Sequence, residues 1–365
     1  MIFNTNLNAI ATYQAGKPIE EVIRVYGIDA KNIIKLASNE NPYGCSPLVS
    51  QAICANASKV SLYPDDSMVD LKEALAKKYN LNAEHFIIGA GSDQIIEFCI
   101  RAKCQQDSKI LMAKTTFAMY EIYAKQSGCQ IIKTKSDMHN LKEFKELYRM
   151  HHPDIIFLCV PNNPLGECLD FSEVHDFLKE IDKNTLVVLD GAYQEYATYR
   201  DVNKAILVDV VQEFENVVYL KTFSKIYGLG GMRLGYGIAS EMIMEYLYKI
   251  RPPFNVSSLS LLCGIEALKD ENFIQKSLEQ NAIEMQKYEI FAQENKIKYI
   301  ESFTNFITFF LENQKCKSSE IAEFLMQNGV IIRDLKSYGL NAIRITIGTL
   351  EQNLKVFSLL KEKIS

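Results

Sequence analysis

Between about residues 85 and 235, short runs of β-branched and other apolar residues alternate with amphipathic segments of helix length. This alternation is typical of crossover units around a mainly parallel sheet, and it predicts an α/β core. The apolar spacing at 171–181 predicts one of the helices. The predicted strands are 86–88, 110–112, 131–133, 155–160, 186–189, 217–220 and 235–238.

The pattern changes after the paired prolines of "RPPFNVSS" at 251–258. Long helical segments at about 259–297 precede an alternating, strand-rich tail, which predicts a smaller α+β domain. The first 40 residues have the pattern of an arm with one short helix near 18–26. We therefore expect an N-terminal arm at 1–43 that packs with the small domain, a large domain at 44–253 and a small C-terminal domain at 254–365.

Composition excludes several classes of protein. Of the 365 residues, 48% are hydrophobic and 23% charged, and the net charge of −5 favours neither nucleic acid nor an acidic membrane as a partner. The longest apolar runs fall below the roughly 18 residues of a membrane span, and the N-terminus lacks the features of an export signal. The nine scattered cysteines form no C-x-x-C pair or zinc-type cluster. We expect a cytoplasmic protein with reduced thiols and no metal.

The segments that follow the predicted strands carry the candidate chemistry, because ligands of open α/β sheets bind outside the carboxyl ends of the strands. In "IIGAGSDQIIEF", strand 86–88 leads into Gly89, Ala90 and Gly91 and then into a helix that we expect Ser92 to cap. Small residues at such a junction let backbone N–H groups face an anion. Taken alone, the segment could equally be a tight turn.

Two further strands end in polar residues. In "CVPNNPLGE", Asn162 and Asn163 stand between two prolines that would hold the amide side chains in fixed directions, although a plain turn is the alternative. In "TLVVLDGAYQEY", Asp190 ends a run that we expect to be buried, and Tyr193 follows three residues later. A buried carboxylate is costly unless it meets a cation or a protonated ring nitrogen. The alternative is an aspartate that caps a helix.

The fourth segment, "KTFSKIYGLGGMRLGY" at 221–236, sets Thr222, Ser224, Lys225 and Arg233 among small residues. A lysine in a cleft can have a lowered pKa and act as a nucleophile, whereas a solvated lysine is the common alternative. The glycines do not match the dinucleotide fingerprint G-x-G-x-x-G, since Arg233 occupies its last position, which argues against a dehydrogenase.

Together these segments supply an anion site, an amide, a buried acid with a nearby phenol, and a reactive amine. Pyridoxal phosphate requires this set: a lysine for its aldehyde, an acid for its ring nitrogen, donors to its ring oxygen and a phosphate site.

The same motifs resemble those of the fold-type I pyridoxal-phosphate-dependent aminotransferases of class I/II. The resemblance covers essentially the whole chain, from "TYQAGKPIEEV" and "KLASNENPYGCSP" through "YPDDSMVDLKEALA", "GAGSDQII", "PNNPLG" and "LDGAYQEY" to "IIRDL" and "IRITIGT". It implies a large cofactor-binding domain with a mainly parallel seven-stranded sheet and a smaller α+β domain.

The resemblance also implies roles for single residues. Lys225 matches the lysine that binds the cofactor covalently, Asp190 the acid that keeps the ring nitrogen protonated, and Tyr193 and Asn163 the donors to the phenolic oxygen. The other positions that match the cofactor site are Ala90, Gly91 and Ser92 at a backbone cradle, Thr222, Ser224 and Arg233 at the phosphate, and Phe117 stacked on the ring. Tyr63 matches a residue that reaches the cofactor of the neighbouring subunit, which implies a homodimer with shared active sites.

Arg344 lies in "AIRITIG", where Ile343, Ile345 and Ile347 would form an apolar face and Arg344 would project from the other. A solvent-facing arginine is the alternative. By resemblance, Arg344 and Asn163 would bind the substrate, with Arg344 gripping an anionic group bidentately. Arg333 and Tyr13 match positions that hold the substrate phosphate in relatives that use histidinol phosphate.

The resemblance is strongest to those relatives, and it implies transfer of the amino group of L-histidinol phosphate to 2-oxoglutarate, with imidazole acetol phosphate and glutamate as products of this step in histidine biosynthesis. An aromatic amino-acid aminotransferase for phenylalanine or tyrosine and, further off, a threonine-phosphate decarboxylase are alternatives that share every cofactor residue. A non-catalytic regulator with the same fold would not need Lys225, Asp190 and Tyr193 together.

Overall fold

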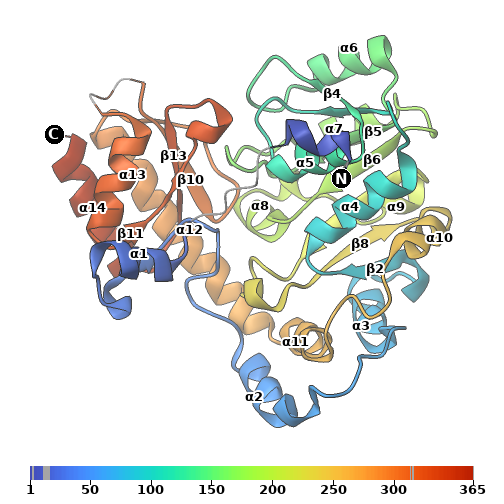
Figure 1. Ribbon diagram of the computed structural model, residues 1–365, viewed down its shortest axis with the longest axis horizontal. Helices are drawn as coiled ribbons and strands as arrows, with labels where there is room; N and C mark the ends of the chain where they lie inside the picture. Colours follow the sequence, from blue (N-terminus) through green and yellow to red (C-terminus); the bar gives the residue numbers. More distant parts are fainter. Residues whose placement is uncertain (2–3, 11–16, 313, 315, 365) are drawn as a thin grey trace.

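The protein is described here by a computed structural model that covers residues 1, 4–10, 17–312, 314 and 316–364. Its central sheet has seven strands in the order β2-β8-β7-β6-β5-β3-β4 (Figure 1). All seven predicted strands are confirmed. β8 runs antiparallel to both of its neighbours, β2 and β7, and the pairs from β7 to β4 are parallel. The strands are β2 (Phe86–Gly89), β3 (Lys109–Met112), β4 (Gln130–Lys133), β5 (Ile155–Cys159), β6 (Leu186–Asp190), β7 (Val217–Thr222) and β8 (Gly235–Ala239).

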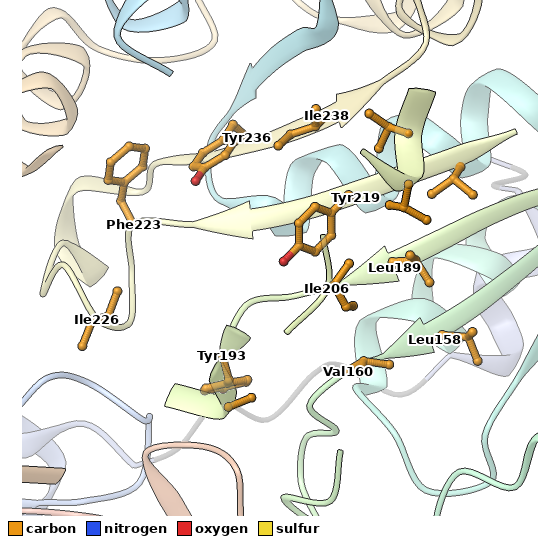
Figure 2. Close-up of a cluster of buried hydrophobic side chains, with 14 of the residues drawn as sticks. Leu158, Val160, Leu189, Tyr193, Ile206, Tyr219, Phe223, Ile226, Tyr236 and Ile238 are labelled. Carbon is orange, nitrogen blue, oxygen red and sulfur yellow. The ribbon is translucent and has the colours of Figure 1, made fainter. Parts of the chain in front are cut away.

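Helices cover both faces of this sheet, so the central strands are buried on both sides. Along β5, Ile155 and Phe157 pack into one apolar cluster, while Ile156 and Leu158 pack into the opposite one, as the two-residue period of a strand requires. Figure 2 shows part of the second cluster, in which Leu158 lies near the side chains of the neighbouring strands. Burial on both faces explains why these strands read as continuous apolar runs.

The helices of the two faces differ. Helices α4 (Ser92–Lys103), α5 (Ala118–Gln126) and α10 (Glu241–Ile250) contribute to the first cluster. The opposite face is covered by α2 (Pro47–Asn56), α3 (Val69–Tyr79), α6 (Leu141–His151), α7 (Phe171–Leu178), α8 (Gln194–Arg200), α9 (Val210–Glu213) and α11 (Ser258–Lys269). The predicted helix at 171–181 is confirmed as α7, although it ends three residues earlier.

A second, antiparallel sheet has the order β12-β13-β10-β9 and lies to one side of the first (Figure 1). Its strands are β9 (Lys298–Tyr299), β10 (Phe306–Phe310), β12 (Arg333–Asp334) and β13 (Ala342–Thr346). It packs with α12 (Glu271–Glu294), α13 (Ser318–Gln327) and α14 (Leu350–Ile364). Near the chain start, α1 (Ile19–Tyr26) lies beside these helices, and β1 (Ile34–Lys35) pairs in parallel with β11 (Val330–Ile331).

One glycine is required where the loop after β7 crosses the N-terminal segment. Gly228 has a φ of +69°, and a Cβ added there would lie 1.8 Å from the carbonyl oxygen of Gly44. No other residue fits this approach without moving the backbone. The close contact brings the loop that carries Lys225 against the segment that follows β1. Among the helices of the described residues, none has the length and apolar character needed to cross a membrane.

Candidate active site

The predicted catalytic residues meet at one edge of the central sheet. Asp190 is the last residue of β6, and Lys225 comes three residues after the end of β7. Because β5, β6 and β7 are parallel, their carboxyl ends share this edge. The Nζ atom of Lys225 lies 5.6 Å from the centre of the Tyr193 ring. The structure therefore brings Lys225, Asp190 and Tyr193 into one site.

The amine of Lys225 is suited to act as a nucleophile and a base. Burial lowers its pKa to about 8, and the positive charge of Arg344 contributes to the decrease. Its Nζ donates a hydrogen bond to the carbonyl of Ser38 at 3.2 Å. A carbonyl does not neutralise the ammonium charge, so this contact offsets little of the lowered pKa.

Asp190 is a buried acid with neutral hydrogen-bond donors. Asp190 is only 3% exposed. Its Oδ2 atom accepts a hydrogen bond from the hydroxyl of Tyr120 at 2.6 Å, and its Oδ1 atom accepts one from the backbone N–H of Ala192 at 3.1 Å. Burial raises the pKa of Asp190, while these two donors act in the opposite direction. A carboxylate accepts up to four hydrogen bonds, so Asp190 can accept another from a cationic ligand.

Tyr120 was not predicted from the sequence. It lies on α5, 70 residues from Asp190, and is fully buried with its ring stacked on Phe157 at a centroid distance of 4.4 Å. In the sequence it is one more apolar position on an amphipathic helix. Only the packing of α5 on the sheet turns it into a partner of the acid.

Arg344, from the small sheet, and Asn163, from the loop after β5, form one side of the site. Arg344 lies on β13 and is only 8% exposed. Its guanidinium donates to the Oδ1 atom of Asn163 at 2.5 Å and to the carbonyl of Ala37 at 2.7 Å. Because the Asn163 oxygen faces the arginine, its amide nitrogen is the atom left to donate to a ligand.

The neighbouring Asn162 has a structural role in the loop after β5. Its amide nitrogen donates to the carbonyl of Thr115 at 2.9 Å and to Oε1 of Glu167 at 2.7 Å. Its backbone N–H donates to the carbonyl of Glu167 at 2.8 Å. These bonds close the loop after β5, and they hold Asn162 away from the site while Asn163 faces it.

The predicted anion cradle lies between β2 and α4. A Cβ added to Gly91, whose φ is +84°, would lie 2.9 Å from the guanidinium of Arg233, so this glycine lets the arginine approach the backbone. The N–H of Ala90 donates to the side chain of Gln94 at 2.8 Å, and that of Gly91 to the carbonyl of Gly89 at 2.7 Å. The expectation that Ser92 caps the helix was wrong: α4 begins at Ser92, and Gly91 is the cap.

The hydroxyls after β7 are held by the loop itself. The Thr222 hydroxyl accepts a hydrogen bond from the N–H of Ser224 at 3.1 Å, which fixes the turn that leads to Lys225. Arg233, in the left-handed region with a φ of +49°, is exposed and donates to the carbonyl of Gly230 at 3.2 Å.

The residues predicted to contact the substrate and the partner subunit are more widely spread. Phe117 and Arg333 both line a cavity of about 1010 Å³ between α5 and the small sheet. Arg333 pairs with Arg344 across β12 and β13. Tyr63 is 82% exposed, and its ring lies 4.7 Å from that of Phe254. Tyr13 lies outside the described residues.

The sequence profile of the aminotransferase class I and II family matches residues 31–358. The chain belongs to the class I and II aminotransferases. This aminotransferase is 60% identical over 363 residues to the histidinol-phosphate aminotransferase of Aliarcobacter butzleri, with 99% of each chain covered. It is 55% identical over 365 residues to the histidinol-phosphate aminotransferase of Helicobacter hepaticus, with 99% of this chain and 98% of the relative covered.

Solved structures agree with the fold of the aminotransferase. The histidinol-phosphate aminotransferase of Sinorhizobium meliloti, crystallised in complex with pyridoxal-5'-phosphate, superposes with a TM-score of 0.90 at 23% identity, covering 99% of this chain and 97% of that one. An aspartate aminotransferase double mutant of Thermus thermophilus superposes with a TM-score of 0.83 at 14% identity, covering 99% of each chain. The fold-type I architecture predicted from the motifs is confirmed.

Proposed function

We propose that the chain is a pyridoxal-phosphate-dependent enzyme that transfers the amino group of L-histidinol phosphate to 2-oxoglutarate. The observation that carries the proposal is the partly buried Lys225 amine, with its pKa lowered to about 8, set in one site with Asp190 and Tyr193. The identity of 60% over nearly the whole length to a histidinol-phosphate aminotransferase supports the choice of substrate.

The donor set fits the cofactor. Asp190 is buried with hydrogen bonds from the neutral Tyr120 and Ala192 groups, and a buried carboxylate is stabilised by a cation such as a protonated ring nitrogen. The Asn163 amide nitrogen and the Tyr193 hydroxyl are donors suited to a phenolic oxygen. The proposed phosphate end is the junction of Gly91, Thr222, Ser224 and Arg233, where Arg233 supplies the charge.

When bound, the cofactor supplies a conjugated ring that accepts the electron pair released from the substrate carbon. In our proposal the protein's side chains transfer the protons and hold them in place. Lys225 would take the proton from the carbon that bears the amine and deliver it to the cofactor carbon that receives the amino group, and its lowered pKa suits it to act as a base. Asp190 keeps a positive charge on the ring nitrogen. Arg344 binds an anionic group of the substrate, and its buried position makes the orientation specific.

Absorbance tests the cofactor and the lysine together. We expect the purified protein to be yellow and Lys225→Ala to lose the band of the lysine-bound cofactor. Lys249→Ala, at an exposed lysine that pairs with Glu245 on α10, is the control and should keep the band. A colourless protein that takes up NAD instead of pyridoxal phosphate would overturn the proposal.

Single-turnover mixing identifies the substrate. L-Histidinol phosphate, phenylalanine and tyrosine are each mixed with the enzyme, and the loss of the cofactor band is followed. We expect L-histidinol phosphate to react fastest, because its phosphate can carry two negative charges and Arg344 has a second arginine, Arg333, opposite it on the neighbouring strand, whereas phenylalanine and tyrosine present a single carboxylate charge. Faster reaction with the plain aromatic amino acids would favour an aromatic aminotransferase. Release of CO₂ from threonine phosphate would favour the decarboxylase.

We also propose a homodimer with shared active sites. Tyr63 and Phe254 form an exposed aromatic pair beside the exposed Val60 and Leu62, and exposed apolar patches of this kind mark interfaces. Mixing inactive Lys225→Ala with Tyr63→Ala and allowing subunits to exchange tests whether Tyr63 acts in the partner's site. If Tyr63 acts in the partner's site, the mixed dimers should recover activity, because one of their two active sites then has both Lys225 and Tyr63. No recovery in dimers shown to be mixed would contradict it.

The division of the chain at residues 44 and 254, and a cytoplasmic location, remain proposals. Limited proteolysis tests the second boundary: a first cut near residue 254 would support it, whereas a first cut after α11, which packs on the central sheet, would place the boundary near residue 270.

A further inference from the structure

The hydroxyl of Tyr193 accepts a hydrogen bond from a residue that the sequence analysis did not single out. The amide nitrogen of Asn39 donates to this hydroxyl at 2.8 Å. Asn39 is 1% exposed and Tyr193 is 3% exposed, so water does not compete for the contact. Asn39 has a φ of +57°, a conformation that asparagine tolerates better than other residues with a side chain.

The orientation of the Asn39 amide is set by Thr346. The hydroxyl of Thr346 accepts a hydrogen bond from the backbone N–H of Asn39 at 3.0 Å, and it donates its single hydrogen to Oδ1 of Asn39 at 3.1 Å. The amide oxygen therefore faces Thr346, and the amide nitrogen faces Tyr193. Because the nitrogen of an amide only donates, the Tyr193 hydroxyl must accept in this pair.

A tyrosine hydroxyl has one hydrogen, and in this arrangement that hydrogen cannot point at Asn39. It is left for an acceptor on the other side, where the proposed function sets the phenolic oxygen of the cofactor. We infer that Asn39, held by Thr346, is a positioning residue that directs the Tyr193 proton to the cofactor. The inference rests on the proposed function, because it needs a cofactor beside Tyr193.

The same network joins Tyr193 to the strand that carries Arg344. Thr346 and Arg344 stand two residues apart on β13 and so share a face of the strand. Arg344 donates to the carbonyl of Ala37, and Thr346 bonds to Asn39 two residues further along. The segment 37–39 is thus tied to β13 at both ends, so the small sheet positions the substrate arginine and the Tyr193 hydroxyl together.

The test is the pH titration of the absorbance of the bound cofactor in the resting holoenzyme. A donor to the phenolic oxygen stabilises its ionised form, so loss of the donor raises the titration midpoint. Tyr193→Phe should raise it by about one to two pH units, the effect of one hydrogen bond to a charged group. Asn39→Asp should raise it nearly as much, because the new carboxylate accepts the Tyr193 hydrogen. Asn39→Gly, which tolerates the positive φ, should raise it less.

A double variant separates orientation from charge. If Asn39→Asp acts through the tyrosine hydroxyl, it adds little to Tyr193→Phe, whereas a direct effect of the new charge on the cofactor adds in full. Thr346→Ser keeps the hydroxyl and should leave the midpoint at its wild-type value, while Thr346→Val should raise it. Asn80→Asp is the matched control, since Asn80 is exposed and has a similar φ of +54°.

Wild-type absorbance distinguishes the possible failures. If the wild type shows no cofactor band, the proposed function fails. If it shows the band and the Asn39 and Thr346 variants leave the midpoint unchanged, or if Asn39→Asp adds in full to Tyr193→Phe, the inference is overturned. Should an Asn39 variant fail to fold, the Thr346→Ser and Thr346→Val pair decides the question.

Discussion

The partly buried amine of Lys225 destabilises the cofactor-free protein near neutral pH, and an uncharged side chain of similar length should relieve this. The pKa of Lys225 is lowered from 10.5 to about 8. A shift of about 2.5 units corresponds to about 3 kcal/mol against the charged form. Lys225→Met removes that cost but loses the hydrogen bond to the carbonyl of Ser38, which contributes about 1 kcal/mol. We expect a net stabilisation of about 2 kcal/mol at pH 7.

The sign of the pH dependence follows from the direction of the shift. Between about pH 8 and pH 10.5, the unfolded chain holds a proton on this lysine that the folded chain has lost. The stability of the wild type therefore rises with pH across this window, whereas Lys225→Met lacks this contribution. The advantage of the variant should be complete below pH 8 and gone by about pH 10.5.

Thermal unfolding of the cofactor-free proteins measures the effect. For 365 residues the unfolding entropy is about 0.8 kcal/mol/K, so 2 kcal/mol corresponds to roughly 3 °C in melting temperature. Lys249→Met is the control: Lys249 is exposed on α10 and pairs with Glu245, so its loss should leave the melting temperature nearly unchanged. A Lys225→Met melting temperature at or below that of the wild type at pH 7, or a gain that persists at pH 10.5, would refute the reasoning.

Three further outcomes follow from the structure. Tyr120→Phe should raise the pKa of Asp190 and weaken pyridoxal-phosphate binding by about 10- to 100-fold in titrations of the cofactor-free protein, and unchanged affinity would contradict the role of this bond. Arg344→Lys keeps the charge but loses the planar two-point grip, so the KM for the anionic substrates should rise about 10-fold or more in steady-state assays, and an unchanged KM would count against a contact with the substrate anion. Gly228→Ala should lower the free energy of unfolding by about 3 kcal/mol or more, because its Cβ would overlap Gly44. Gly27→Ala has the same φ but lies in open space, so it should lower the free energy of unfolding by only about 1 kcal/mol. Equal losses in thermal unfolding would exclude the overlap.

The sequence alone located the central strands and the loops that carry the chemistry. Strands such as β5 and β6 are buried on both faces, so their apolar runs stand out, and the polar residue that ends each run marks the carboxyl edge of the sheet. Because parallel strands end at one edge, Asn163, Asp190 and Lys225 could be expected to meet. Motif resemblance then supplied Arg344, which no local pattern distinguishes from a surface arginine.

The tertiary structure alone decided how the site residues are held. Tyr120 and Asp190 are 70 residues apart, Asn39 and Tyr193 are 154 apart, and Asn39 and Thr346 are 307 apart. Hydrogen bonds between such distant residues cannot be read from the sequence, because the periodic pattern around each partner reflects only its own helix, turn or strand. The sequence therefore determined which groups the site contains. The packing of α5 on the central sheet, and the hydrogen bonds from β13 to Asn163 and to the segment 37–39, decided which donor faces each acceptor.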